Sequence, residues 1–194
     1  MTTRIFTYVT LVISLGLAYY LFHVINSKLE QDRQIVKTEQ EVIERLKLIR
    51  QLEIAYLSRK GKYTDNWDSL RNFAQNDYIY LINKEEKVFT LAYGADSSVF
   101  VIDTVGKISV RDSIINPKQY PDLSLAELEL APGSGKPFAV KVDKIQKGGV
   151  LVDVIEVKDV APVNPIRKED NEIKNRKPLR FGSLEEVSTS GNWE

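Results

Sequence analysis

The sequence predicts an α+β protein in which an N-terminal transmembrane helix continues as a long amphipathic helix packed on an antiparallel β-sheet, with an extended C-terminal tail. Three observations predict this order. Residues 5–27 carry no charge, no Gly or Pro interrupts residues 18–60, and strand-like alternation begins near Tyr78. The chain thus divides into a membrane anchor (1–27), a helical stalk (28–60), a mainly β head (61–160) and an extended or disordered tail (161–194).

The composition excludes several classes of function. The chain has 194 residues, no Cys, one His, and equal numbers of basic and acidic residues, 27 of each. Without Cys there are no disulfides, thiol nucleophiles, iron–sulfur clusters or Cys-bound zinc, and a single His leaves no multi-His metal site. The balanced charge argues against a nucleic-acid partner. We therefore expect a non-enzymatic protein with no cofactor and no metal.

The apolar run at residues 5–25 is long enough for a transmembrane helix. At about 1.5 Å per residue it reaches roughly 30 Å, which is the hydrocarbon thickness of a bilayer. The run is longer than the apolar core of a signal peptide, and no Ala-x-Ala site follows it, so we expect an uncleaved anchor. A buried core helix is the alternative. The side chains expected to face lipid are Ile5, Tyr8, Leu11, Leu15, Tyr19, Tyr20 and Ile25.

The stalk is predicted to be one helix with an apolar stripe that widens along its length. Glu, Gln, Lys, Arg and Leu, all strong helix formers, dominate it. A broad stripe favours a helix lying against a globular domain, whereas a narrow seam would favour a short parallel coiled coil that holds a dimer. We prefer the first of these. The predicted packing face comprises Ile35, Val42, Ile43, Leu46, Ile49 and Tyr56.

The head is predicted to begin where Gly61 ends the long helix. Thr64 or Asp65 can cap a short second helix with Trp67, Leu70 and Phe73 on its apolar face. Alternating apolar residues then predict an antiparallel meander on the outer part of the long helix, and a separate strand pair after it. The meander comprises 78–83, 88–93, 98–103 and 107–111; the pair, 138–145 and 150–157, turns at Gly148 and Gly149.

Two groups of residues between the strands could carry chemistry. Gly133–Pro137 contains Gly-Lys, but a Walker A loop needs Gly at the position of Leu130 and Ser or Thr at the position of Pro137, so we interpret the segment as a turn. Ser124 can form a capping box with Glu127. The loop acids Asp122, Glu127 and Glu129 could serve a glycosidase or a cation site, although solvated acids in loops are commoner. The strand-end acids Asp96, Asp103 and Asp112 could bind Ca²⁺, although no spacing resembles an EF-hand.

The tail from Ala161 onwards is rich in Pro, Asn, Lys, Arg and Glu and poor in apolar residues. Such a composition is typical of an extended or disordered segment that orders only on a partner. An exposed aromatic residue in a flexible tail can anchor it to another protein. The residues predicted to dock a partner are Arg176, Lys177, Arg180 and Trp193.

The order of parts resembles type IV pilins and pseudopilins. The passage from Arg45 to Leu70 looks like the pilin segment in which a helix ends in Ala-Tyr, followed by Gly-x-Tyr and a stretch reaching Leu. Here those positions are Ala55, Tyr56, Gly61, Tyr63 and Leu70. The resemblance covers the anchor, the stalk and the first strands. The Gly that ends a prepilin leader is missing near Arg4, so the resemblance implies a pilin-like layout without leader processing.

These features together predict a non-enzymatic structural or scaffold subunit of a cell-envelope assembly, of the pilus-like, secretion or motility kind. Its expected partners are membrane lipid and other envelope subunits, and it is expected to form a homo- or hetero-oligomer. Two rival hypotheses are a membrane-tethered envelope enzyme that uses loop carboxylates and a ligand-sensing module, which would need an apolar pocket.

The expected location is the cytoplasmic (inner) membrane, crossed once. Charge near the anchor is Arg4 on one side and Lys28, Arg33 and Lys37 on the other, which by the positive-inside rule would place the head in the cytoplasm. The pilin-like layout implies the opposite orientation. We adopt an extracytoplasmic head because the resemblance outweighs a difference of two positive charges.

Overall fold

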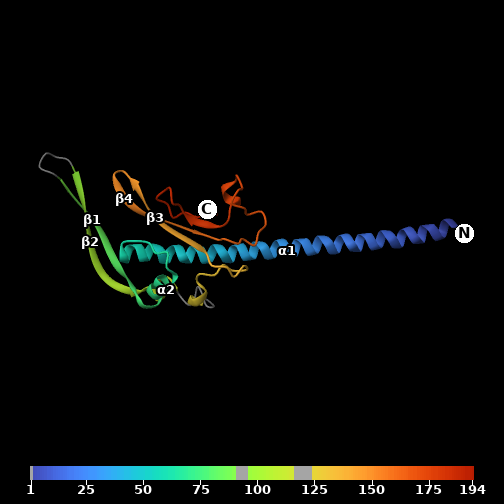
Figure 1. The fold of residues 1–194 in the computed structure, drawn as a ribbon, viewed down its shortest axis with the longest axis horizontal. Coiled ribbons are helices and arrows are strands. Elements are labelled where there is room, and N and C mark those ends of the chain that lie inside the picture. Colours follow the sequence, from blue (N-terminus) through green and yellow to red (C-terminus); the bar gives the residue numbers. More distant parts are fainter. Residues whose placement is uncertain (1, 91–95, 116–123) are drawn as a thin grey trace.

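The computed structural model describes residues 2–90, 96–115 and 124–194, and it is built on one helix. This helix, α1 (Thr2–Lys60), runs as a single rod whose C-terminal half is embedded in the head and whose N-terminal half projects from it (Figure 1). It ends as predicted at Gly61, which has a φ of 76° and donates its N–H to the carbonyl oxygen of Leu57 at 2.8 Å.

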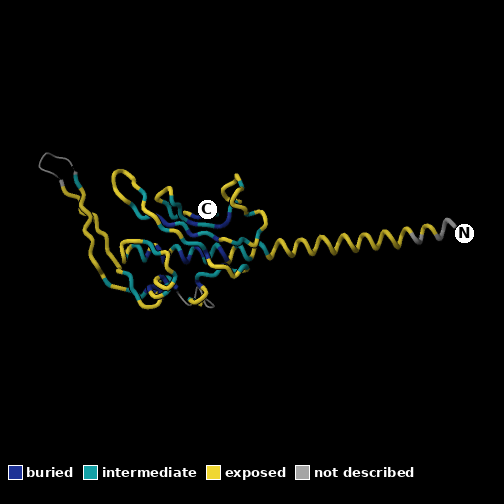
Figure 2. Tube along the Cα trace, viewed as in Figure 1, coloured by how far each residue is buried: buried dark blue, intermediate teal, exposed yellow. Residues whose placement is uncertain are grey.

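In the projecting half of α1, every described side chain from residue 6 to residue 34 is exposed (Figure 2). Among the described residues, α1 is the one helix long and apolar enough to cross a membrane, and its most apolar window has no cover from the rest of the protein. Leu11, Leu15, Tyr19, Tyr20 and Ile25 are all exposed. The side chains of Ile5 and Tyr8 lie outside the described residues. An apolar helix without a covering domain is compatible with a single membrane span.

The other half of α1 supplies one side of the core. Val42, Leu46 and Ile49 are buried, Ile43 and Tyr56 pack against the same cluster, and Ile35 is half-buried. The predicted face omitted a second buried row on the same helix, made of Leu48, Leu52 and Ala55. This stretch of α1 is therefore covered on more than one side.

A short helix and a three-stranded sheet supply much of the rest of the core, and Val110, Ile115, Leu128 and Ala131 from the connecting segments complete it. Helix α2 (Trp67–Asn76) buries Leu70 and Phe73, and its N-cap is Asn66, which accepts from Ser69 N–H at 2.9 Å, not Thr64 or Asp65 as predicted. The sheet has the antiparallel order β3 (Ala139–Lys147), β4 (Val150–Lys158), β5 (Arg180–Gly182). The β3–β4 hairpin is the predicted pair, and Gly148 and Gly149 at its turn have φ of 59° and 83°.

The predicted four-stranded meander is wrong. The structure has two long strands, β1 (Tyr78–Thr90) and β2 (Asp96–Ser109), paired antiparallel as one hairpin. The segment 84–87 is part of β1 because Lys-Glu-Glu-Lys contains no turn-forming residue, and 104–106 makes only a bulge, opposite Leu81 and Ile82. The hairpin does not lie along α1 but projects from the end of the head farthest from the N-terminus (Figure 1).

Short turns connect these elements. A four-residue helix, α3 (Val110–Ser113), follows β2, and single 3₁₀ turns lie at η1 (Leu125–Glu127) and η2 (Lys174–Arg176). Ser124 precedes η1 but makes no capping bond with its side chain, so the predicted capping box is absent. The Gly-rich turn before β3 packs on α1, because a Cβ on Gly133 would lie 2.5 Å from Cγ2 of Thr38.

The prediction of an extended or disordered tail is also wrong. Residues 180–182 form β5 beside β4, and Leu179 and Phe181 are fully buried in the core cluster. The composition of the tail misled the prediction because two apolar side chains in a polar context are enough to add an edge strand when the neighbouring sheet is already formed.

Candidate interaction surface

The β1–β2 hairpin exposes an unusual amount of apolar surface for a folded protein. A two-stranded hairpin is marginally stable by itself, and contiguous exposed apolar patches mark sites of interaction. Here the apolar side chains lie on both faces of the hairpin, along β2 and at the two ends of β1. The exposed ones are Tyr80, Leu81, Ile82, Val88, Phe89, Val99, Phe100, Val101, Ile102 and Val105. We call this set, with its two strands, the apolar hairpin.

The base of the apolar hairpin is held firmly to the end of α1. The guanidinium of Arg59 lies 4.9 Å from the ring centroid of Tyr78 and 5.4 Å from that of Tyr80. Asp77 pairs with Lys60 Nζ at 2.7 Å and with Arg59 Nε at 3.6 Å. Partial burial raises the pKa of Asp77, but the hydrogen bond from Lys60 and the neighbouring positive charges outweigh it and hold that pKa below its usual value.

The two strands of the apolar hairpin differ in their charge. The middle of β1 is Lys84-Glu85-Glu86-Lys87, whereas β2 carries no charge from Ser97 to Ile102. The register pairs Glu85 with Val101 and Glu86 with Phe100, so the two patterns lie side by side. Lys84 Nζ sits 3.9 Å from the ring centroid of Phe100, which brings a β1 cation over a β2 aromatic ring. The two outer edges of the hairpin are therefore chemically unlike.

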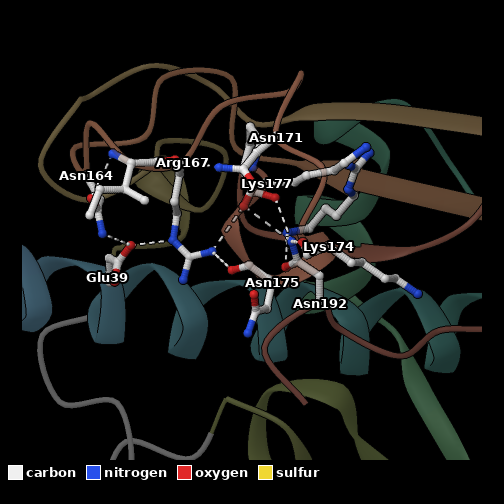
Figure 3. Close-up of polar contacts among 11 residues, drawn as sticks. Glu39, Asn164, Arg167, Asn171, Lys174, Asn175, Lys177 and Asn192 are labelled. Atoms are coloured by element: carbon white, nitrogen blue, oxygen red, sulfur yellow. Dashed lines mark hydrogen bonds and ion pairs between the residues drawn. The ribbon is translucent and has the colours of Figure 1, made fainter.

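A network of polar contacts holds the tail against α1 at the opposite end of the head (Figure 3). The carboxylate of Glu39 accepts from Nε of Arg167 and, at 3.0 Å, from Nδ2 of Asn164. The Nη1 of Arg167 donates to the carbonyl oxygens of Asn175 and Lys177, at 2.7 and 3.0 Å. This guanidinium thus joins the long helix to two turns of the tail.

Asn192 locks the last residues into the same region. Its side chain is buried, donates to the carbonyl oxygen of Pro178 at 2.9 Å and accepts from Arg180 N–H at 3.1 Å. Arg50 of α1 donates to the carbonyl oxygen of Thr189 at 3.2 Å and to Oε1 of Glu194 at 2.7 Å. Because these polar groups are satisfied within the chain, the network acts as a structural clamp.

The structure separates the residues predicted to dock a partner. Arg180 lies in β5 and pairs with Glu156 at 3.3 Å and Glu169 at 3.2 Å. The ring of Trp193 packs against the core cluster with the guanidinium of Arg50 6.0 Å away. Lys177 is half-buried, and Arg176 is exposed. The prediction of one exposed docking tail is therefore wrong for Arg180 and Trp193, whose interactions are internal.

The buried carboxyl of Glu53 was not predicted from the sequence. Its side chain is 1% exposed in the core, and Oε2 accepts one hydrogen bond from Thr64 N–H at 3.2 Å. Burial raises the pKa of Glu53 to about 8; the Thr64 N–H opposes this shift, and the charge of Asp65 adds to it. Among the described residues, no basic side chain pairs with this carboxyl. The one signal in the sequence was the position of this Glu within the apolar stripe of the long helix.

The structure describes the side chains of four of the predicted loop and strand-end acids. Glu129 pairs with Nη2 of Arg71 at 3.8 Å, Asp103 lies in β2 of the hairpin, and Asp112 is exposed in α3. Glu127 is exposed in η1. Asp122 and the side chain of Asp96 lie outside the described residues. Within 2–90, 96–115 and 124–194, no group of three or more potential metal-ligating side chains occurs.

Comparison with known protein families, curated proteins and solved structures finds no match for this chain. We therefore infer the function from the geometry of the molecule itself. Its two prominent surfaces are the uncovered apolar half of α1 and the apolar hairpin at the other end of the head.

Proposed function

We propose that this chain is a single-pass membrane protein that acts as a non-enzymatic structural subunit of a cell-envelope assembly, with the apolar hairpin as its contact surface for other subunits. The observation that carries the proposal is the exposed apolar surface at each end of one rigid helix. A lipid bilayer suits the first, and a protein partner suits the second. The pilin-like order of helix, loop and strands favours assemblies of the pilus, secretion or motility kind.

Detergent extraction followed by co-purification tests this role. We expect the full chain to bring down other envelope subunits or further copies of itself, and Phe100→Asp to reduce their recovery at least tenfold, because a charge in the middle of β2 opposes burial. The control is Leu151→Asp, which changes a still more exposed apolar residue next to the β3–β4 turn. Recovery of free monomers from the unmodified chain would contradict the proposal.

The orientation of the head can be tested separately. We propose a cytoplasmic N-terminus and an extracytoplasmic head, and we expect a reporter that is active only after export to be active when fused through a linker behind the exposed Glu194. A reporter active only in the cytoplasm, fused at the same point, serves as the control. Activity of the second reporter alone would reverse the orientation and remove the envelope-assembly hypothesis.

The head is expected to fold without the anchor. A fragment of residues 28–194 retains the buried part of α1 and every residue of the core cluster. We expect it to remain in solution without detergent and to show helix and strand by circular dichroism, because residues 1–27 contribute no buried side chain among those described. An unfolded fragment would show that the core depends on the membrane segment.

A further inference from the structure

The outer edge of β2 has the character of an inner strand. Natural edge strands carry charges that prevent pairing with other chains, whereas strands inside a sheet are apolar on both faces. β1 follows the first rule with Lys84–Lys87, and β2 follows the second with Val99–Ile102, whose four side chains are between 39% and 63% exposed. The hairpin therefore presents one protected edge and one edge suited to pairing.

We propose that the β2 edge pairs antiparallel with the β2 edge of a second copy of this chain, giving a four-stranded sheet in the order β1-β2-β2-β1. This inference rests on the proposed role of the apolar hairpin as a contact surface, and it names the partner. In this sheet the uncharged strands lie inside and the charged strands form both outer edges, which is the pattern expected of a complete antiparallel sheet.

Between two copies of this chain, the charge pattern favours pairing through the β2 edges over pairing through the β1 edges. Pairing through β2 places the uncharged Val99–Ile102 segment against itself, so it brings no like charges together. Pairing through β1 would place the acidic residues Glu85 and Glu86 close to their own symmetry mates. The bulge opposite Leu81 and Ile82 limits regular pairing to the outer part of the hairpin.

The architecture also brings two β2 edges together. The hairpin lies at the end of the head farthest from the N-terminus and runs across the direction of α1 (Figure 1). Copies anchored in one membrane by the same helix hold their hairpins at the same height above it. Confinement to a membrane raises the effective concentration of one edge for another, so a short edge-to-edge contact suffices for association.

Disulfide scanning of the full chain in membranes tests the proposal. The sequence contains no cysteine, so each introduced thiol is the only one in the chain. Single Cys substitutions at positions 98–103 place thiols along the β2 edge. Residues opposite one another on antiparallel strands have Cβ atoms about 4.5–5.5 Å apart, close to the distance a disulfide needs. We expect a maximum of disulfide-linked dimer near one position, with yield falling on either side.

The matched control is Glu85→Cys. Glu85 is the cross-strand partner of Val101, so this thiol lies at the same height of the hairpin but on the protected strand. We expect at least tenfold less dimer from Glu85→Cys than from the best β2 position. We expect an equal loss when Ile102→Lys is added to that β2 variant, or Phe100→Lys if the best position is 102. These changes are on exposed residues, so none disturbs the core.

Three results would overturn the second-copy proposal: no dimer from any β2 position, equal dimer from Glu85→Cys, or disulfide capture of a different protein. The last would leave the proposed function intact, because the hairpin would still contact another subunit. Absence of all cross-links together with an unchanged co-purification of Phe100→Asp would overturn both proposals.

Discussion

Replacing Gly182 by Ala is expected to lower the free energy of unfolding of the head by about 3–5 kcal/mol. Gly182 ends β5 with a φ of 80°, a conformation that L-residues rarely adopt. A Cβ there would lie 1.9 Å from the carbonyl oxygen of Ile155 on the neighbouring strand β4. Neither backbone can move aside without breaking the β4–β5 ladder, which includes the pair Glu156 and Gly182.

Gly135→Ala is the matched control for this substitution. Gly135 also has a positive φ, 64°, but an added Cβ would meet no atom within 4 Å. It should therefore lose only about 1 kcal/mol from the backbone conformation. Urea unfolding of the detergent-solubilised chain, followed by the fluorescence of Trp67 and Trp193, measures both. Equal losses of unfolding free energy for the two variants would show that a clash with the carbonyl oxygen of Ile155 is not the reason for glycine at position 182.

The large effect expected at Gly182 depends on contacts between distant segments. Such contacts are not visible in the local sequence, and for this reason the fold of the tail could not be predicted. A three-residue strand of Arg-Phe-Gly has no periodicity to read, and the neighbouring residues are polar. Its position depends on Phe181 entering a core formed by distant segments, and on Asn192, which accepts from Arg180 N–H and donates to the carbonyl oxygen of Pro178 just before the strand. Such tertiary interactions override local composition, so the sequence indicated disorder where the chain is folded.

Elements with strong local signals were predicted well. The end of α1 at Gly61 and the β3–β4 turn at Gly148 and Gly149 have residues that permit a positive φ at the places where the chain needs it. The strand type of β1 and β2 was also predicted. Their lengths were not, because a charged segment between two apolar ones was interpreted as a turn, although Lys84–Lys87 is compatible with a solvent-exposed strand.

The fold reveals the apolar hairpin as a contact surface, and no sequence motif marks it. Its residues are ordinary strand formers, and a strand of this composition would usually be half-buried. Only the structure shows that β1 and β2 leave the core beyond Ile79 and Ile108, which are half-buried at the base. The predicted meander would have covered those same side chains on α1, and so it hid the surface on which the proposed function depends.

The buried carboxyl of Glu53 is expected to make the head less stable as pH rises. Its pKa is about 8 in the folded protein because burial penalises the charged form, and it is near 4.5 in an unfolded chain. Between these values the folded state holds a proton that the unfolded state has released. The free energy of unfolding therefore falls as pH rises from about 4.5 to 8 and levels off above 8, with a total loss of about 5 kcal/mol.

Glu53→Gln is expected to remove this dependence. Glutamine has the shape of the protonated acid, and its oxygen can accept the Thr64 N–H that now bonds Oε2 at 3.2 Å. At pH 5 the variant and the unmodified chain should be about equally stable. At pH 8.5 the variant should be more stable by about 4 kcal/mol, because it never places a charge in the core.

The measurement is a series of urea unfolding curves of the detergent-solubilised chain between pH 5 and 8.5. Glu41→Gln, an exposed carboxyl on the same helix, is the control and should follow the unmodified profile. The charge of Asp65 also raises the pKa of Glu53, so the double variant Asp65→Asn with Glu53→Gln separates the contribution of Asp65. Parallel plots of unfolding free energy against pH for Glu53→Gln and the unmodified chain would contradict this prediction. They would show that Glu53 is ionised in the folded head, because the slope arises only when the folded state holds a proton that the unfolded state has released.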